Sequence, residues 1–190
     1  MLKNTESSYG SVAKWLHWLI ALWVLAAYVI ILYLTSKSDA FPLPGLNIHK
    51  VVGFSILVPV LFRLYWRWSN SKPVLPASMP RWQQRVSGLS HGLLYFFLIA
   101  MPLTGYLGNG GGMDYGLFRI PPFLGSPVSA WIDEVFGISD SQWNDFFDTL
   151  HYGIMGPWLF WMLIAVHAGA AIYHHCVQQD EILKRMLPGK

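Results

Sequence analysis

The sequence is poor in cysteine and in charged residues. It contains one cysteine, Cys176, and 12% charged residues, against ~25% in an average soluble domain. A single cysteine cannot form a disulfide within the chain, and there is no C-x-x-C-H motif for covalent haem attachment. The charges are dispersed, and basic residues do not alternate with aromatic ones, so nucleic-acid binding is not indicated. These shortages exclude a disulfide-stapled domain and favour a chain that lies in a membrane.

Apolar residues dominate the composition, at 54% of the chain. Ten tryptophans, nine tyrosines and eleven phenylalanines suit the aromatic belts found at both surfaces of a membrane. Four apolar segments, at about 15–35, 49–66, 88–107 and 151–177, are long enough to cross a bilayer. They lack the period-two alternation of barrel strands. The sequence therefore predicts an all-α fold, a single domain over residues 1–190 that forms a transmembrane four-helix bundle surrounded by lipid.

Lysine and arginine are distributed unevenly among the connections, and this predicts the orientation. The two terminal arms and the second connection carry most of them: Lys3, Lys14, Arg67, Lys72, Arg81, Arg85, Lys184, Arg185 and Lys190. The first and third connections carry only Lys37 and Arg119, with Lys50 just inside the second segment. Because positively charged loops remain in the cytoplasm, both termini are predicted to be cytoplasmic.

The third connection, about 108–149, is long for a compact bundle and is predicted to lie on the outer, periplasmic side. It is acidic, and residues 129–136 are expected to form a short amphipathic helix. Asp140 or Ser141 is then the expected N-cap of a helix that continues into the fourth segment. The second connection is proline-punctuated with a basic end, so we expect it to lie as a linker on anionic headgroups.

The histidines form two pairs of matching depth. His151 and His167 are sixteen residues apart on the fourth segment, roughly 24 Å along an α-helix, which is most of the hydrocarbon thickness. His49 shares the outer depth of His151, and His17 shares the inner depth of His167. Bundles build cofactor sites from side chains on facing helices. Two facing imidazole pairs without cysteine ligands are typical of bis-histidine haem iron, with one pair near each face of the membrane.

Other residues agree with this interpretation. Gly53 lies one turn beyond His49, where a missing side chain would let a flat macrocycle approach. Arg63 lies near the inner level, and the predicted spans contain no acid to pair with it, so a haem propionate is the expected partner.

Alternatives remain for several of these residues. Arg63 could instead extend to the inner headgroups, and the glycines could serve close helix packing. His91 could equally be a hydrogen-bonding group between helices. His174 and His175 are expected to be interfacial polar residues rather than iron ligands, with possible contact to a quinone.

Several stretches together resemble the bacterial cytochrome b561 family. They are the run from Tyr9 to His17-Trp18, the His49-x-x-x-Gly53 start of the second segment with Arg63, His91 leading to MPLTG, and HAGAAIYHH from His167 with the tail DEILKRMLP. The resemblance covers nearly the whole chain apart from the third connection. It implies four helices in a bacterial inner membrane that bind two haems b and exchange electrons with quinone. Position by position, it implies His17 and His167 as ligands of the inner haem and His49 and His151 as ligands of the outer one.

One spacing departs from the family pattern. The family's two ligands on the fourth helix are usually about two residues closer than His151 and His167. On an ideal α-helix, sixteen residues place them about 160° apart around the axis. An insertion, kink or bulge near Gly156-Pro157 would therefore be needed to turn both toward their partners.

The expected function is electron transfer between a periplasmic reactant and ubiquinone. The resemblance extends to members that oxidise superoxide, and Lys50 and Arg119 could draw such an anion in, although the acidic loop opposes strong steering. The acidic loop could instead dock a periplasmic redox protein. The chain would then be a haem-bearing membrane anchor that relays electrons for a partner dehydrogenase, and whether it is itself an enzyme stays open. A histidine-based metal or proton transporter would need acids beside the histidines, which the predicted spans lack.

Overall fold

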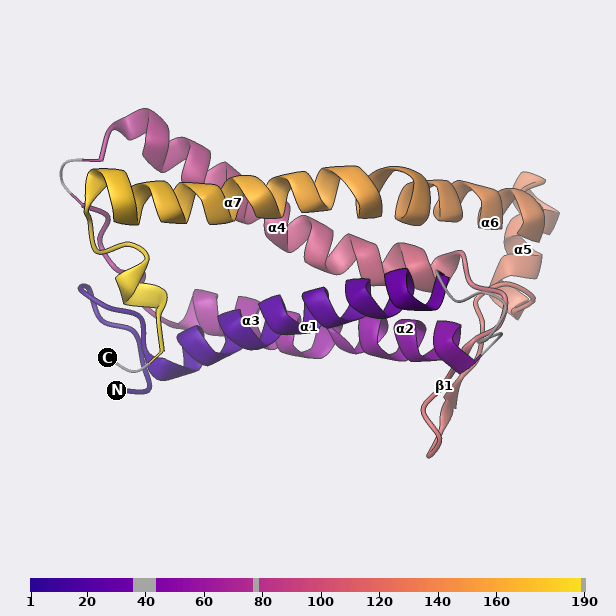
Figure 1. Cartoon of the computed structure of the whole chain (residues 1–190). Coiled ribbons are helices and arrows are strands. Elements are labelled where there is room, and N and C mark those ends of the chain that lie inside the picture. Colours follow the sequence, from indigo (N-terminus) through magenta and orange to yellow (C-terminus); the bar gives the residue numbers. More distant parts are fainter. Residues whose placement is uncertain (36–43, 77–78, 189–190) are drawn as a thin grey trace.

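The computed structural model describes residues 1–35, 44–76 and 79–188 (Figure 1). In this part of the chain, four helical segments are long and apolar enough to cross a membrane: Ser11–Tyr33, Leu46–Ser69, Arg81–Leu107 and Asp140–Gln178. They run side by side, and both termini lie at the same end of the bundle (Figure 1). The predicted transmembrane four-helix bundle is confirmed. Lys37, in the first connection, lies outside the described residues.

The first two spans are packed against each other. The first is α1 (Ser11–Thr35), and the second consists of α2 (Pro44–Ser55) and α3 (Leu57–Ser69). Ile20, Ala27, Ile56 and Val60 form a buried cluster between them. The second span was predicted as one helix over about 49–66, but it has a turn at Ile56. Pro59 explains the turn, because it has no N–H and its ring opposes the carbonyl four residues earlier, at Ser55.

The third span, α4 (Arg81–Leu107), begins earlier than the predicted residue 88. Arg81 to Ser87 were assigned to a linker because they are basic, but Pro80 stands at the N-cap and the helix begins directly after it. Proline fixes φ at a helical value and lacks a donor that a helix start would leave unused. The helix therefore begins at Arg81, directly after Pro80, and not at the start of the apolar run.

The fourth span is continuous but is not α-helical throughout. It comprises α6 (Asp140–Asp148), the π-helix η1 (Thr149–Phe160), α7 (Trp161–Tyr173) and the π turn η2 (His174–Gln178). The N-cap of α6 is Ser139, rather than Asp140 or Ser141, because Ser139 and Gln142 exchange the two hydrogen bonds of a capping box. Phe97 of α4 packs with Met155 and Phe160 of η1 in a second buried cluster.

The long third connection is structured. It contains the strands β1 (Met113–Asp114) and β2 (Arg119–Ile120), paired antiparallel, and α5 (Pro127–Phe136). The helix expected over 129–136 begins two residues earlier, because Ser126 caps it by accepting a hydrogen bond from the Ser129 amide. Gly137 ends it in the left-handed conformation, at φ 66°.

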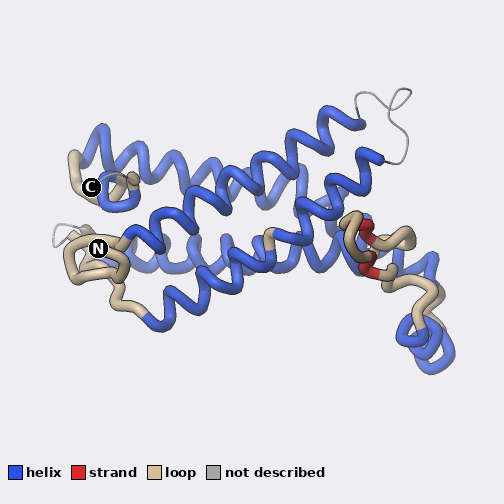
Figure 2. The backbone as a smooth tube through the Cα atoms, turned by 90° about the horizontal axis from the view of Figure 1, so that it is seen from below, coloured by secondary structure: helices blue, strands red, loops and turns tan. Residues whose placement is uncertain are grey.

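Three segments that are distant in sequence meet at the end that carries the termini (Figure 2). The N-terminal arm joins the second connection, because Asn4 donates to the Ser71 carbonyl at 2.9 Å. The C-terminal tail, including the 3-10 turn η3 (Lys184–Met186), crosses this end of the bundle toward α1 (Figure 1). Arg185 donates to the Val74 carbonyl at 2.7 Å, and Trp18 of α1 donates to the Met186 carbonyl at 3.0 Å.

Candidate functional site

His49 and His151 face each other at the end of the bundle remote from the termini. Their ring centroids are 6.3 Å apart, with planes at 78°. His49 Nδ1 lies 2.9 Å from the Ala27 carbonyl oxygen, and His151 Nδ1 lies 2.9 Å from the Met101 carbonyl oxygen. Because a carbonyl only accepts, Nδ1 must carry the proton in both rings. The Nε2 lone pair of each histidine is therefore free to bind a metal.

The π-helix η1 explains why His151 faces His49 despite its long spacing to His167. In a π-helix the backbone bonds run from i to i+5, so each turn takes in nearly one more residue than an α turn. The π-helical residues from His151 to Phe160 therefore take up roughly two extra residues between the two histidines. This is the surplus by which the spacing exceeds the family pattern. Both histidines consequently lie on the side of the helix that faces their partners.

Glycines leave open space around His49 and His151, called the outer pair because they lie at the end remote from the termini. An apolar cavity between the rings is lined by His49, Gly53, Met101, His151, Gly156 and Phe160, among others. A Cβ added at Gly53 would meet nothing within 4 Å, so close helix packing does not require this glycine. At Gly105 a Cβ would lie 2.9 Å from His151 Cε1, so a side chain here would push the imidazole out of place.

A second pair, called the inner pair because it lies toward the end that carries the termini, has nearly the same spacing. The ring centroids of His17, on α1, and His167, on α7, are 6.1 Å apart, with planes at 72°. Arg63 of α3 is close enough to interact electrostatically with both histidines. Its guanidinium donates to the Ala13 carbonyl at 2.6 Å, so it is held against α1 rather than extended to the headgroups.

His91, on α4, also reaches the inner pair. Its ring centroid lies 5.3 Å from that of His167. Its Nδ1 lies 2.7 Å from the carbonyl oxygen of Ser87, one turn earlier on its own helix, so this bond does not join two helices. The prediction placed His91 near the same inner depth but did not group it with His17 and His167. The shared depth of His91 and His167 along their helices was the signal that could have revealed this contact.

Both pairs have the spacing that a metal between two trans imidazoles requires. With a metal–nitrogen bond of about 2 Å, each ring centre lies roughly 3 Å from the metal, so two trans rings have centroids about 6 Å apart. The 6.1 Å and 6.3 Å separations agree with this value. At His49 and His151, the apolar cavity and the carbonyl-bonded Nδ1 atoms complete a donor set that fits bis-histidine haem iron.

The two remaining histidines have different surroundings. His174 is buried, and its Nδ1 lies within hydrogen-bonding distance of the Asp180 carboxylate, in the C-terminal tail. His175 is exposed. The two neighbouring histidines therefore differ: the His174 side chain is buried against Asp180, and the His175 side chain is exposed.

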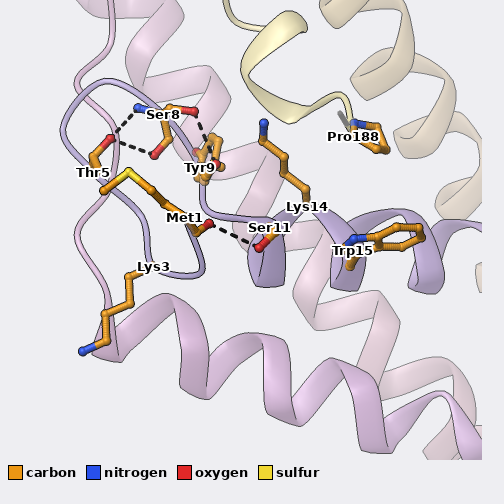
Figure 3. Close-up of a pocket in the computed structure, with 9 residues that line it drawn as sticks. All are labelled: Met1, Lys3, Thr5, Ser8, Tyr9, Ser11, Lys14, Trp15 and Pro188. Carbon is orange, nitrogen blue, oxygen red and sulfur yellow. Dashed lines mark hydrogen bonds between the residues drawn. The ribbon is translucent and has the colours of Figure 1, made fainter. Parts of the chain in front are cut away.

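A second cavity, of about 230 Å³, lies among the N-terminal arm, the start of α1 and Pro188. Figure 3 shows its lining, which is rich in hydroxyl groups and contains no histidine. Lys3 and Lys14 point in different directions, so they do not converge on one ligand (Figure 3). This cavity is separate from both histidine pairs.

Two cations meet at the outer end. Arg119 donates to the Gly111 carbonyl at 2.9 Å, and Lys50 Nζ lies 3.2 Å from where a Cβ of Gly111 would be. Lys50 directly follows His49, so the structure brings positive charge close to the outer pair.

A membrane bundle of four helices with facing histidine pairs is the architecture of a membrane cytochrome that binds haem and transfers electrons. The chain belongs to the prokaryotic cytochrome b561 family, whose model matches residues 8–189. Cytochromes of this family bind b-type haem.

Named relatives match nearly the full chain. It is 28% identical to cytochrome b561 homolog 2 of Escherichia coli (strain K12), over 97% of this chain and 93% of that protein. It is also 28% identical to cytochrome b561 homolog 1 of the same organism, over 92% and 93%. A probable superoxide oxidase CybB of Yersinia pestis is 26% identical, over 97% of this chain and 98% of that protein.

Proposed function

We propose that the chain binds two haems b and carries single electrons across a bacterial inner membrane. His17 and His167 would be the axial ligands of the inner haem, and His49 and His151 those of the outer one. The observation that carries this proposal is the similar spacing of the ring centroids in the two pairs, 6.1 Å and 6.3 Å. Haem b supplies one-electron redox chemistry, and the protein fixes the ligands, buries the macrocycle and sets the polarity around it.

The surrounding residues have supporting roles in this proposal. Gly53 leaves room for the outer macrocycle, and Arg63 would pair with a propionate of the inner haem while remaining bonded to the Ala13 carbonyl. A propionate would also provide the negative charge that an arginine inside a membrane needs.

The proposed reactants are superoxide on the periplasmic side and ubiquinone on the inner side. Lys50 and Arg119 at Gly111 place positive charge where an anion would approach the outer pair. A relative is named as a probable superoxide oxidase, which agrees with this choice. Two superoxide ions would each give up one electron and leave as O₂. One quinone would take up both electrons and two protons to become a quinol.

Quinone is proposed to bind at the inner end, near His174 and His175. His174 is buried and paired with the Asp180 carboxylate, so a polar pair lies at this end of the bundle. Both termini are proposed to be cytoplasmic, which follows from the predicted charge asymmetry and puts this end on the side where protons are taken up.

We expect the purified protein to contain two haems b per chain. Absorption spectra of the oxidised and dithionite-reduced protein, together with a pyridine haemochrome assay against protein concentration, measure the type and number of haems. Sharp bands of a reduced low-spin b cytochrome with about two haems per chain are the expected result, as two bis-histidine sites require. A protein without haem bands contradicts the proposal.

Superoxide-dependent reduction of ubiquinone by the haem-loaded protein alone then tests the reactants. Superoxide dismutase should abolish the reaction, since it removes the electron donor. If haem is present but superoxide reduces no quinone, the chain is instead a relay for a partner dehydrogenase, and a redox subunit should then co-purify with it.

The Gly105→Ala variant is expected to lose much of the outer haem. The added methyl group would lie 2.9 Å from His151 Cε1, while that ring is held through Nδ1 by the Met101 carbonyl. Haem content should fall from two toward one per chain. Gly88→Ala is the matched control, because Gly88 lies on the same helix and its Cβ would meet nothing within 4 Å. Equal haem content in the two variants would show that His151 does not need this space.

A further inference from the structure

The hairpin formed by β1 and β2 stands out sideways from the bundle near its outer end. In Figure 1 it leaves the bundle next to α2 and points away from the helix axes. The hairpin belongs to the third connection, which contributes no residue to either histidine pair. Its purpose is therefore not explained by the proposed haem sites.

The hairpin is fixed to α2 by hydrogen bonds and by a buried side chain. Asn47 makes two bonds to the backbone of Asp114: its amide donates to the carbonyl at 2.7 Å, and its side-chain oxygen accepts from the N–H at 2.9 Å. Met113 is only 2% exposed. The bonds of Asp114 to Asn47 and the burial of Met113 thus set the direction in which the hairpin points.

From the base of the hairpin, the Tyr115 side chain reaches along the second span, toward the middle of the membrane-crossing segment. The Tyr115 hydroxyl lies 3.1 Å from Ser55 Oγ, eight residues beyond Asn47 on α2. Eight helical residues correspond to roughly 12 Å along the axis. The span begins at Leu46, so Tyr115 reaches to a depth well inside the outer end of the membrane-crossing segment.

The tip is apolar and has no cover within the described structure. Leu117 is 96% exposed and Phe118 is 58% exposed. The Phe118 ring stacks on Tyr115, with centroids 4.7 Å apart, and is held in this position. An isolated exposed leucine is ordinary, but here it adjoins two stacked aromatic rings at the depth of a membrane span.

Cations lie at the base of the same hairpin. Arg119 bonds to the Gly111 carbonyl, and Lys50 Nζ approaches the same glycine. Cations at the headgroup level with aromatic and aliphatic groups below them are the arrangement by which proteins anchor at a lipid interface.

We propose that this hairpin is an interfacial lipid anchor, with Leu117 and Phe118 inserted among the acyl chains of the outer leaflet. The second span also presents apolar side chains to lipid, with Val58 73% and Leu61 55% exposed. The partner that surrounds Leu117 and Phe118 is therefore phospholipid. The anchor holds Gly111, with its two cations, at the membrane surface beside the outer histidine pair.

A fluorescent probe at the tip tests this directly. In a Cys176→Ser background, Leu117→Cys is labelled with an environment-sensitive fluorophore, and the protein is placed in nanodiscs that contain phosphatidylcholine with a nitroxide on the upper acyl chain. Glu134→Cys, on the exposed face of α5, is the matched control in the same loop. We expect blue-shifted emission at position 117 and roughly threefold or more stronger lipid quenching than at 134, as for groups buried below the headgroups.

Aqueous iodide should show the reverse order, with stronger quenching at position 134. Equal emission and equal lipid quenching at both positions would overturn the proposal, as would stronger iodide quenching at 117. Phe118→Cys provides a second tip position, so that the result does not depend on one labelled variant. An unchanged haem spectrum in each variant shows that it is folded.

Discussion

Replacing His151 with alanine is expected to leave the protein with one haem per chain instead of two. His151 and His49 face each other at 6.3 Å with their Nδ1 atoms bonded to backbone carbonyls, and the other histidines lie toward the opposite end of the bundle, too far away to replace either ring. A bis-histidine iron that loses one axial ligand also loses its low-spin spectrum and much of its hold on the protein. Roughly half of the reduced haem absorbance should disappear. His49→Ala should give the same result.

The matched control is Tyr152→Ala, because Tyr152 adjoins His151 in the π-helix and is 78% exposed. That variant should keep both haems. His17→Ala should instead remove the inner haem, so that a redox titration of the two classes of variant leaves two different surviving potentials. If His151→Ala binds two haems with both potentials intact, the outer ligand assignment is wrong.

Much of the fold follows from the sequence because it depends on composition. Four long apolar runs can only be four spans, since lipid cannot satisfy the backbone of anything but a helix or a closed barrel. The helix after Ser139 was also anticipated to within a residue or two, because capping leaves a local signature. Depth along a span is a matter of counting residues, and counting was enough to place His17 beside His167 and His49 beside His151.

The features that the sequence did not reveal depend on contacts. The two-residue strands of the hairpin have no periodicity to detect, and they exist because Asn47 holds the Asp114 backbone. His91 could be placed at the inner depth, but its approach to His167 depends on how α4 rotates against α7. The start of α4 at Arg81 depended on Pro80 and not on hydrophobicity.

The π-helix lies between these two cases. No residue type marks a π-helix, so its extent over Thr149–Phe160 could not be predicted from composition. The long spacing from His151 to His167 did show that an α-helix would separate the two imidazoles around the axis. In the structure, the π-helix turns both imidazoles toward their partners, and there is no sharp kink at Pro157.

Gly156 is the residue on which this winding depends, and Gly156→Ala is expected to remove the outer haem. A Cβ at Gly156 would lie 2.6 Å from the carbonyl oxygen of His151, closer than real Cβ atoms approach. The opposing atom belongs to the backbone, which cannot turn away as a side chain does. The segment should therefore rewind toward an α-helix, which turns His151 away from His49. Haem content should fall from about two to about one per chain.

Two further variants separate this cause from general damage to the helix. Gly153→Ala lies in the same π-helix, but its Cβ would meet only the Thr149 methyl group, at 3.8 Å, so both haems should remain. Deleting Gly156 and Pro157 together shortens the histidine spacing to fourteen residues, which on an α-helix brings the two rings to within about 40° of the same face. The deletion should therefore bind more outer haem than Gly156→Ala, although it removes more of the chain. General damage to the helix would instead make the deletion, the larger change, lose more haem than Gly156→Ala. Equal haem loss in both variants would show that the π-helix does not orient His151.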